Sequence, residues 1–310
     1  MNTRLPCLVQ GLMEPKSQSY GTLTPSLVIQ EVPCPMDPLS KRVRLQVERL
    51  LYMFTAPARV LPDFIVIGAH KAGTTSFYEY LRQHPMIISA WKKDIKYFDL
   101  HFHRGSLWYR SYFPSKYRMR VDRYSGQRYI TGDGATDYFF SPQAPQRIAN
   151  LLPDVKLLLA LRSPVDRAYS HYQHIYRNGW EPLSFEEAIE QENHRLQADA
   201  EDDETMPAFR RYGYVKKGLY ANYLEKWFEI FPKDRIFIVR SEDFFGDDAL
   251  DVYCQAQEFL GLPIWKHIKF KNANPGKYQD MKPKISQKLA EYYKPHNQRL
   301  YELVGRDFGW

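Results

Sequence analysis

Short apolar runs alternate with longer stretches of helical periodicity along most of the chain. Each run is rich in leucine or β-branched residues and fits a strand that is buried on both faces of a sheet. We predict strands at residues 64–67, 156–161 and 235–239, and helices at 76–84, 164–176 and 220–231. Strands that alternate with helices typically form a parallel sheet covered on both sides. The pattern therefore predicts an α/β fold, a three-layer sandwich with a central, mostly parallel sheet flanked by helices.

The N-terminal region has a different composition. Residues 1–40 are rich in Pro, Ser, Thr and Gln and have little periodicity, which is typical of a loosely ordered segment. Residues 39–58 then place apolar side chains at helical spacing between Lys and Arg, which predicts an amphipathic helix. We therefore expect residues 1–60 to form a leader and residues 61–310 to form one folded domain.

The formal net charge of +7 indicates an anionic partner, although a solvated basic surface is the alternative. Nucleic acid is not expected as that partner, because no helix-turn-helix, zinc-finger or RNP pattern is present. The three cysteines, Cys7, Cys34 and Cys254, are widely spaced and fit neither a disulfide framework nor a metal site. No apolar run is long enough for a transmembrane helix, and no signal peptide is recognisable. The expectation is a soluble cytoplasmic protein that requires no metal.

The stretch from Gly68 to Ser76 lies between a predicted strand and a predicted helix, and it has the features of an anion-binding loop. A glycine turn that leads into a helix N-terminus presents backbone N–H groups to an anion. Lys71 adds a positive charge, and the Thr and Ser hydroxyls add donors. Gly68 and Gly73 have the spacing of the nucleoside-triphosphate loop G-x-x-x-x-G-K-[ST], but Thr74 stands where that loop has its lysine. A nucleotide triphosphatase or kinase is therefore the weaker interpretation, and a loop without a ligand stays possible.

A second candidate anion site follows the predicted strand at 156–161. Arg162 stands at the end of this strand, a proline turn follows, and Ser170 lies about two turns along the next helix. Arg162 could instead cap the strand end while Ser170 faces a neighbouring element. The two turns together, at the ends of two parallel strands, fit one ligand that carries phosphates at both ends.

Lys-x-Gly-Thr-Thr-Ser after a strand resembles the 5′-phosphosulfate loop of the sulfotransferases that use 3′-phosphoadenosine-5′-phosphosulfate (PAPS). The resemblance extends over about residues 62–310 and is greatest to the heparan sulfate N- and 3-O-sulfotransferases and their bacterial relatives, whose fold is P-loop-like. It implies that Lys71 contacts the bridging oxygen and the sulfonate, and that Arg162 and Ser170 bind the 3′-phosphate. It further implies cofactor contacts, for PAPS and its product PAP, from Ala72, Gly73, Thr74, Thr75, Ser76, Tyr220, Gly276 and Lys277. Lys277 would close over the cofactor and share the catalytic role of Lys71.

The resemblance also suggests the acceptor side. The family has a glutamate as general base where this chain has Asp94, one methylene shorter, and an aspartate at the position of Asp99 supports it. A strand or loop at residues 92–99 would place Asp94 and Lys96 on one face. Asp133 is the alternative base, and Gly134 replaces a lysine that the family often carries next to it. One positive charge near the acceptor is therefore expected to be missing.

The sequence thus predicts a PAPS-dependent sulfotransferase that uses in-line transfer and a carboxylate base. The acceptor implied by the resemblance is a carbohydrate, with a small alcohol or a carrier-bound acyl chain as the alternative, and O- and N-sulfation are both open. The competing classes are a nucleotide-binding P-loop protein and a non-catalytic polyanion-binding module. The oligomeric state is not predicted.

Overall fold

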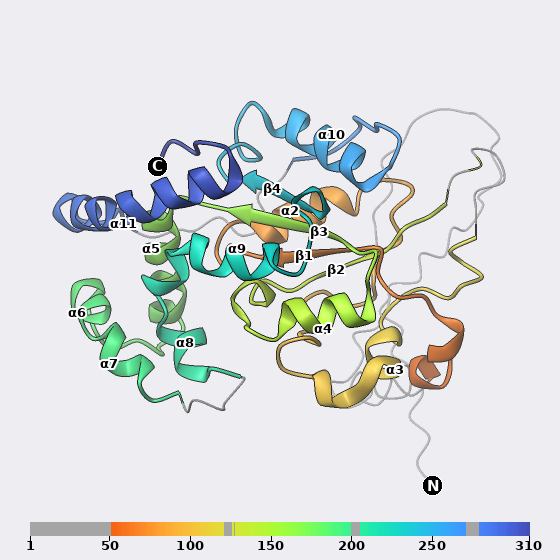
Figure 1. Ribbon diagram of the computed structural model, residues 1–310, viewed down its shortest axis with the longest axis horizontal. Coiled ribbons are helices and arrows are strands. Elements are labelled where there is room, and N and C mark those ends of the chain that lie inside the picture. Colours follow the sequence, from red (N-terminus) through yellow and green to blue (C-terminus); the bar gives the residue numbers. More distant parts are fainter. Residues whose placement is uncertain (1–50, 121–125, 127, 200–204, 271–278) are drawn as a thin grey trace, which may run out of the picture. The chain divides into compact units, whose positions relative to one another are not determined.

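The computed structural model describes residues 51–120, 126, 128–199, 205–270 and 279–310 (Figure 1). Most of the predicted leader lies outside these ranges, as do Gly276 and Lys277. Of the predicted amphipathic helix, residues 51–54 are described and are helical, and a short 3₁₀ turn, η1 (Ala56–Ala58), follows them. In the described part of the chain, no helix is both long and apolar enough to cross a lipid bilayer.

Four parallel strands form the centre of the protein. They are β1 (Phe64–Gly68), β2 (Gly132–Gly134), β3 (Lys156–Leu161) and β4 (Ile236–Arg240), in the spatial order β2-β1-β3-β4. Every residue of β1 is buried, and so is every residue of β3 after the first, because helices cover both faces. The predicted parallel α/β sheet is confirmed, and its strand ends define one edge of the molecule.

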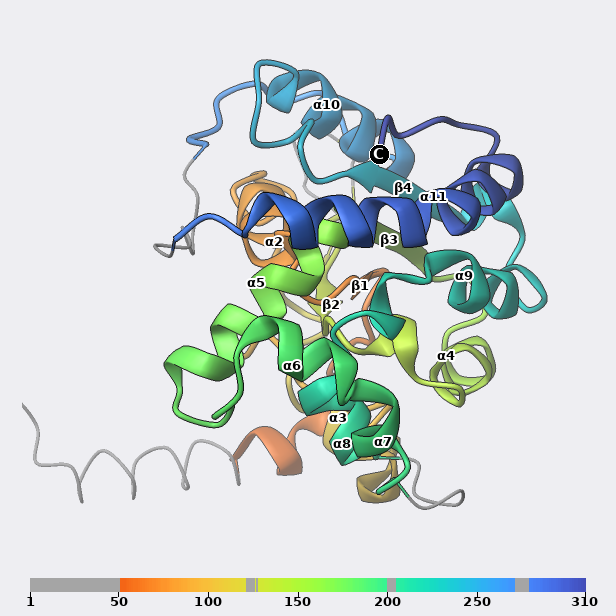
Figure 2. The ribbon, with the colours of Figure 1, turned by 90° about the vertical axis from the view of Figure 1, so that its left-hand side faces the viewer.

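The helices lie on both sides of this sheet. Figure 2 looks onto the edge at which the strands end, with α2 (Thr74–Leu81) on one side and α4 (Ala144–Leu151) and α9 (Tyr220–Phe228) on the other. α5 (Pro164–Arg177) crosses this edge. The remaining helices and turns are η2 (Phe102–Arg104), α3 (Gly105–Arg110), η3 (Tyr138–Phe140), α6 (Phe185–Glu190), α7 (Glu192–Leu196), α8 (Pro207–Tyr212), η4 (Lys216–Gly218), η5 (Lys233–Arg235), α10 (Ala249–Leu260) and α11 (Pro283–Val304).

The short edge strand β2 was not predicted. Its sequence is Gly-Asp-Gly, and Asp133 pairs in register with Ile65 of β1. The ring of Phe64 fills the space beside Gly132 so closely that a Cβ atom there would lie 2.2 Å from it. Tertiary packing therefore selects this strand, against the low strand propensity of glycine and aspartate.

The start of α2 also differs from the sequence prediction. The helix was expected at residues 76–84 but is observed at Thr74–Leu81, and its capping position is Gly73, with φ 75° and no side-chain capping bond. The threonine hydroxyls are therefore not used for capping, and Thr74 is itself the first residue of the helix.

Candidate active site

The loop between β1 and α2 is held in an unusual backbone conformation. Lys71 and Gly73 both have left-handed geometry, with φ angles of 68° and 75°. This conformation is strained for a lysine and is concentrated at functional sites in proteins. The hydroxyl of Ser241, just beyond β4, donates a hydrogen bond of 2.7 Å to the carbonyl of Ala72 and fixes the loop from below.

Glycine is required at position 73 for two reasons. Its φ angle favours a residue without a side chain, and a Cβ atom there would lie 2.6 Å from the ring of Phe245. The loop backbone therefore passes directly against an aromatic ring that closes its underside.

Lys71 is surrounded by other cations. Burial, together with the charges of Arg177, Arg162 and Arg167, lowers the pKa of its ammonium to about 8. In the described part of the chain, neither Lys71 nor Arg162 forms an ion pair with a carboxylate. Glu242 accepts a hydrogen bond of 2.9 Å from the backbone of Ser163 in the adjoining turn. Cations that converge in this way favour an anionic ligand.

The turn after β3 is built as a second part of this anion site. Ser163 caps α5 by accepting a hydrogen bond from the backbone of Asp166, and Arg162 stands at the end of β3. Tyr220 is buried, and its hydroxyl donates a hydrogen bond of 2.8 Å to the carbonyl of Arg162. Tyr220 thus orients the turn, and Ser170 is buried farther along α5.

Arg167, also on α5, is completely buried beside this turn. It donates a hydrogen bond to the carbonyl of Tyr214, while its Nε and Nη1 atoms have no hydrogen-bond partner among the described residues. Its charge therefore adds to the positive potential around Lys71 and Arg162.

Asp94 lies on an irregular loop rather than on a strand. Asp94 and Lys96 both have positive φ angles, 59° and 56°, and Lys96 Nζ lies 3.5 Å from Asp94 Oδ2. Left-handed backbone thus brings together the two side chains that the sequence placed on one face. Burial raises the pKa of the Asp94 carboxyl, and Lys96 opposes that rise. A carboxylate with a raised pKa is a better proton acceptor than an ordinary surface aspartate.

Asp133, the alternative base, is completely buried. Its carboxylate accepts hydrogen bonds from the hydroxyls of Tyr109 (3.0 Å) and Tyr138 (3.2 Å) and from the backbone of Gly134 (2.7 Å). Burial raises its pKa to about 7 although these hydrogen bonds oppose the rise. This environment holds the Asp133 carboxylate in place and shields it from solvent.

Lys93 lies beside Gly134, where the family often carries a lysine. Its Nζ atom is 3.4 Å from the carbonyl of Thr74, and a Cβ atom on Gly134 would lie 3.5 Å from Lys93 Cε. Burial lowers the pKa of Lys93 to about 8, while Glu79 and Asp94 act to raise it. A cation therefore occupies this position, supplied by a different part of the chain. It lies between the anion-binding loop and the carboxylates of Asp94 and Asp133.

Asp137, four residues after Asp133, was missed by the sequence interpretation. It pairs with Lys217 Nζ at 3.2 Å and with Arg210 Nη1 at 3.5 Å, and Arg210 Nη2 also reaches the buried Asp99 at 3.0 Å. Burial would raise the pKa of Asp137, but the charges of Lys217 and Arg210 hold it well below its usual range. Asp99 is thus held by Arg210. The sequence signal that indicates Asp137 is its placement opposite Asp133, with each aspartate two residues from Ala135.

The histidines near the site and along the chain are divided between different regions. His70 packs edge-on against His171 at 4.7 Å and also faces His174. Burial lowers the pKa of all three rings, so they are neutral at pH 7. His84 is bonded to the carbonyl of Pro263 and the backbone of Met86, and His101 packs with His103 near α3.

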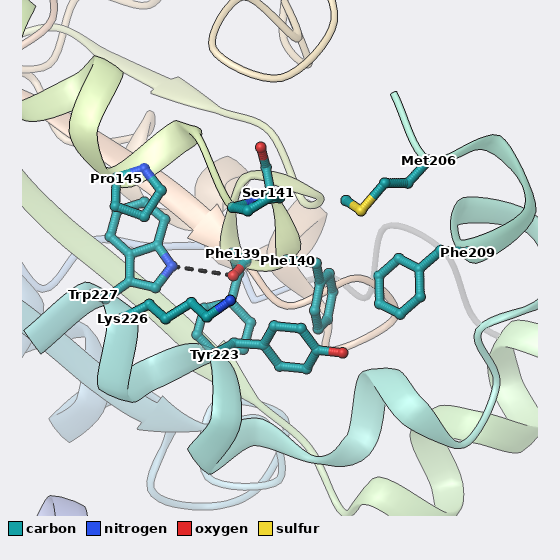
Figure 3. A pocket seen from close by; sticks show the side chains of 10 residues that line it. Phe139, Phe140, Ser141, Pro145, Met206, Phe209, Tyr223, Lys226 and Trp227 are labelled. Carbon is teal, nitrogen blue, oxygen red and sulfur yellow. Dashed lines mark hydrogen bonds between the residues drawn. The ribbon is translucent and has the colours of Figure 1, made fainter. Parts of the chain in front are cut away.

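A separate apolar pocket of about 220 Å³ lies between η3, α8 and α9 (Figure 3). Lys226 is the one charged residue among those that line it. The indole of Trp227 donates a hydrogen bond of 3.1 Å to the carbonyl of Phe139 in its wall. This lining does not suit a ligand with several phosphates. Among the described residues, no group of three or more His, Cys, Asp or Glu side chains could hold a metal ion.

This architecture, with an anion loop after β1 and an arginine turn after β3, agrees with comparisons to known proteins. The sulfotransferase domain family matches residues 61–299, so the chain belongs to the sulfotransferase family and is a sulfotransferase enzyme. Two curated relatives are similar over most of the chain. Human heparan sulfate glucosamine 3-O-sulfotransferase 6 is 30% identical, over 81% of this chain and 74% of its own length. The mouse protein of the same name is 28% identical, over 90% and 82% respectively.

A solved structure supports the same assignment. The crystal structure of a sulfotransferase from Alicyclobacillus acidocaldarius is 27% identical to this chain and superimposes with a TM-score of 0.64. The match covers 80% of this chain and 98% of that protein. The resemblance to the sulfotransferases and the fold expected from the sequence are therefore confirmed.

Proposed function

We propose that this protein transfers the sulfuryl group of PAPS to a hydroxyl of a carbohydrate acceptor related to heparan sulfate. The observation that carries the donor assignment is the cluster of Lys71, Arg162, Arg167 and Arg177, in which each charge around Lys71 lowers its pKa. A donor with a phosphosulfate at one end and a 3′-phosphate at the other would place negative charge among these cations. The assignment of a carbohydrate acceptor is supported by the two curated relatives, which are named as heparan sulfate glucosamine 3-O-sulfotransferases.

The residues of the two turns would bind opposite ends of the donor. The backbone of residues 72–76, at the N-terminus of α2, suits the 5′-phosphate, and Thr74, Thr75 and Ser76 add hydroxyl groups. Arg162 and Ser170 suit the 3′-phosphate, with Tyr220 fixing the carbonyl of Arg162. Gly276 and Lys277, which lie outside the described residues, are retained as cofactor contacts on the resemblance alone.

PAPS supplies an activated sulfuryl group whose leaving oxygen belongs to the 5′-phosphate. When this S–O bond breaks, its electron pair goes to the phosphate oxygen, and Lys71 offsets the negative charge that grows there. Lys277 would share this role. Positioning by the two turns keeps the acceptor oxygen, sulfur and leaving oxygen in line.

Asp94 is the group best suited to take the acceptor proton as the new S–O bond forms. Its carboxylate is half-buried, its pKa is raised, and its Oδ1 atom has no hydrogen-bond partner among the described residues. Asp133, buried below it, would position the loop rather than touch the acceptor. Asp99 would act through Arg210.

The test is transfer from ³⁵S-labelled PAPS to a panel of N-sulfated heparan oligosaccharides, a phenol, a small alcohol and an acyl carrier, with PAP binding measured by calorimetry. We expect PAP to bind more tightly than ATP and label to enter the oligosaccharides. Tight PAP binding with label on another acceptor would replace the carbohydrate, and equal binding of PAP and ATP would contradict the donor assignment.

A further inference from the structure

The C-terminal end of α5 carries a loop that is fixed in place from below. Gly179 adopts left-handed geometry with φ 72°, and the backbone N–H of Trp180 donates to the carbonyl of Ile175. The next residue, Glu181, is buried and receives two hydrogen bonds from Arg195, at 2.6 and 3.2 Å, and one from Tyr214 at 2.7 Å. Such a buried and fully bonded anchor holds the loop in one conformation.

This rigid loop holds an aromatic side chain out toward solvent. The Trp180 side chain is 52% exposed, and Tyr176, one turn before it, is 51% exposed with its ring stacked on Tyr172. Large aromatic side chains that are fixed in position yet half exposed commonly mark contact surfaces.

Cations accompany these rings. The guanidinium of Arg211 on α8 lies 5.7 Å from the ring centre of Trp180, and in the described chain it has no carboxylate partner. Its neighbour Arg210 pairs instead with Asp99 and Asp137. Helix α8 therefore directs Arg210 toward two carboxylates and Arg211 toward Trp180.

Arg177 connects this surface to the donor site. It stands three residues before Trp180, and after burial its charge is the strongest influence on the pKa of Lys71. The ring of His174, one turn earlier on α5, lies 6.4 Å from that of His70, the residue before Lys71, so the surface formed by Tyr176, Arg177, Trp180 and Arg211 begins close to the anion-binding loop.

We propose that Tyr176, Trp180 and Arg211 form an acceptor subsite for a sugar residue next to the one that is sulfated, and that this sugar carries a sulfate or carboxylate. The C–H face of a pyranose ring packs on the electron-rich face of an indole, while a guanidinium pairs with a sulfate as a planar fork. The charge of Arg211, left without a carboxylate beside an exposed ring, favours an anionic glycan over a neutral one. This proposal rests on the carbohydrate acceptor of the proposed function.

The test compares the kinetics of Trp180→Ala, Trp180→Phe and Arg211→Ala with those of the unaltered protein, using an N-sulfated heparosan octasaccharide and its N-acetylated counterpart. We expect Trp180→Ala to raise KM for the N-sulfated octasaccharide about tenfold, from the loss of one stacking contact, while kcat and PAP affinity change little. Trp180→Phe should recover most of that affinity. Arg211→Ala should raise KM about threefold for the N-sulfated acceptor and less for the N-acetylated one, as for a solvent-exposed charge pair.

Tyr117→Ala is the matched control, because Tyr117 is also an exposed ring under an arginine, Arg120, but belongs to the segment that pairs with Arg59. It should leave KM unchanged. Unaltered KM in both Trp180→Ala and Arg211→Ala, in a protein that sulfates the octasaccharide, would overturn the subsite alone. Failure of the unaltered protein to bind PAP or sulfate any glycan would overturn the proposed function instead.

Discussion

Asp137 and Lys217 form an ion pair in the interior of the protein, with Lys217 Nζ 3.2 Å from Asp137 Oδ1. The Lys217 side chain is almost completely buried, and its ammonium lies over the rings of Phe140 and Phe209 at 5.3 Å each. Burial lowers the pKa of Lys217 to about 8, and Asp137 opposes this effect. The pair therefore lies against the rings of Phe140 and Phe209, which also line the apolar pocket of Figure 3.

Replacing Lys217 by methionine should lower the free energy of unfolding by about 3 to 5 kcal/mol, since it leaves the Asp137 charge buried with one partner fewer. Urea denaturation followed by circular dichroism measures this. The double variant Lys217→Met with Asp137→Asn should lose less than the single one. Lys216→Met, at the exposed neighbouring position, is the control and should be neutral. Equal stability of Lys217→Met and Lys216→Met would show that the pair is not stabilising.

Lys71→Ala should reduce kcat by about 10²- to 10³-fold, because a charge that stabilises the leaving phosphate is lost. The fold should be retained, as judged by circular dichroism, and Lys288→Ala on the exposed face of α11 should keep full activity. Turnover of Lys71→Ala close to that of the unaltered protein would remove Lys71 from the mechanism.

The affinity for PAP should fall as the pH rises through about 8. A lysine binds an anion in its protonated form, and burial together with Arg177, Arg162 and Arg167 lowers the pKa of Lys71 to about 8 in the free protein. Calorimetry between pH 6.5 and 9.5 should therefore show proton uptake on binding near the upper end of this range. Lys71→Arg should flatten the profile, because arginine stays protonated. A profile with the same slope in both proteins would assign the effect to another group.

Asp94→Asn should slow the chemical step by about 10²- to 10⁴-fold, the usual contribution of a general base. The affinity for PAP should be unchanged, since Asp94 faces the acceptor side. Asp94→Glu restores the carboxylate and should recover part of the rate, which single-turnover kinetics would resolve. If Asp94→Asn were as active as Asp94→Glu, the base would have to be sought elsewhere.

Asp133 should make the stability of the protein depend on pH. Its pKa is raised to about 7 in the folded protein, above the value of an unfolded chain. The folded state therefore binds the proton more tightly than the unfolded state does. The contribution of Asp133 to the free energy of unfolding is complete below about pH 4 and is lost as the pH rises to about 7. Asp133→Asn should remove this decline between pH 4 and 7, measured as the urea midpoint. A decline of the same size in the variant would place the titrating group elsewhere.

The regular elements near the site were predicted well because their signals are local. The strand at 156–161 has the predicted bounds, and the helix from Pro164 ends one residue later than expected, at Arg177. The third strand was placed one residue early, at 235–239, and the helix beginning at Tyr220 was extended to 231, beyond its observed end at Phe228. Apolar periodicity and a proline at the helix start are sufficient for such elements.

The acceptor side was less predictable because it is built by distant contacts. No local pattern indicates that Lys93 fills the space beside Gly134, or that Arg210 and Lys217 converge on Asp137. The buried state of Asp133 likewise depends on the hydroxyls of Tyr109 and Tyr138, which approach from different parts of the chain. The roles of the residues named from the sequence remain predictions, and the experiments above test them.

The left-handed backbone at Lys71 and Asp94 sets stability and activity against each other at these positions. Glycine would adopt either conformation at no steric cost, so Asp94→Gly could yield a protein that resists denaturant better than the natural one. It would do so by discarding the carboxylate that the proposed reaction needs. Selection of variants for stability alone would therefore favour a protein that has lost the Asp94 carboxylate.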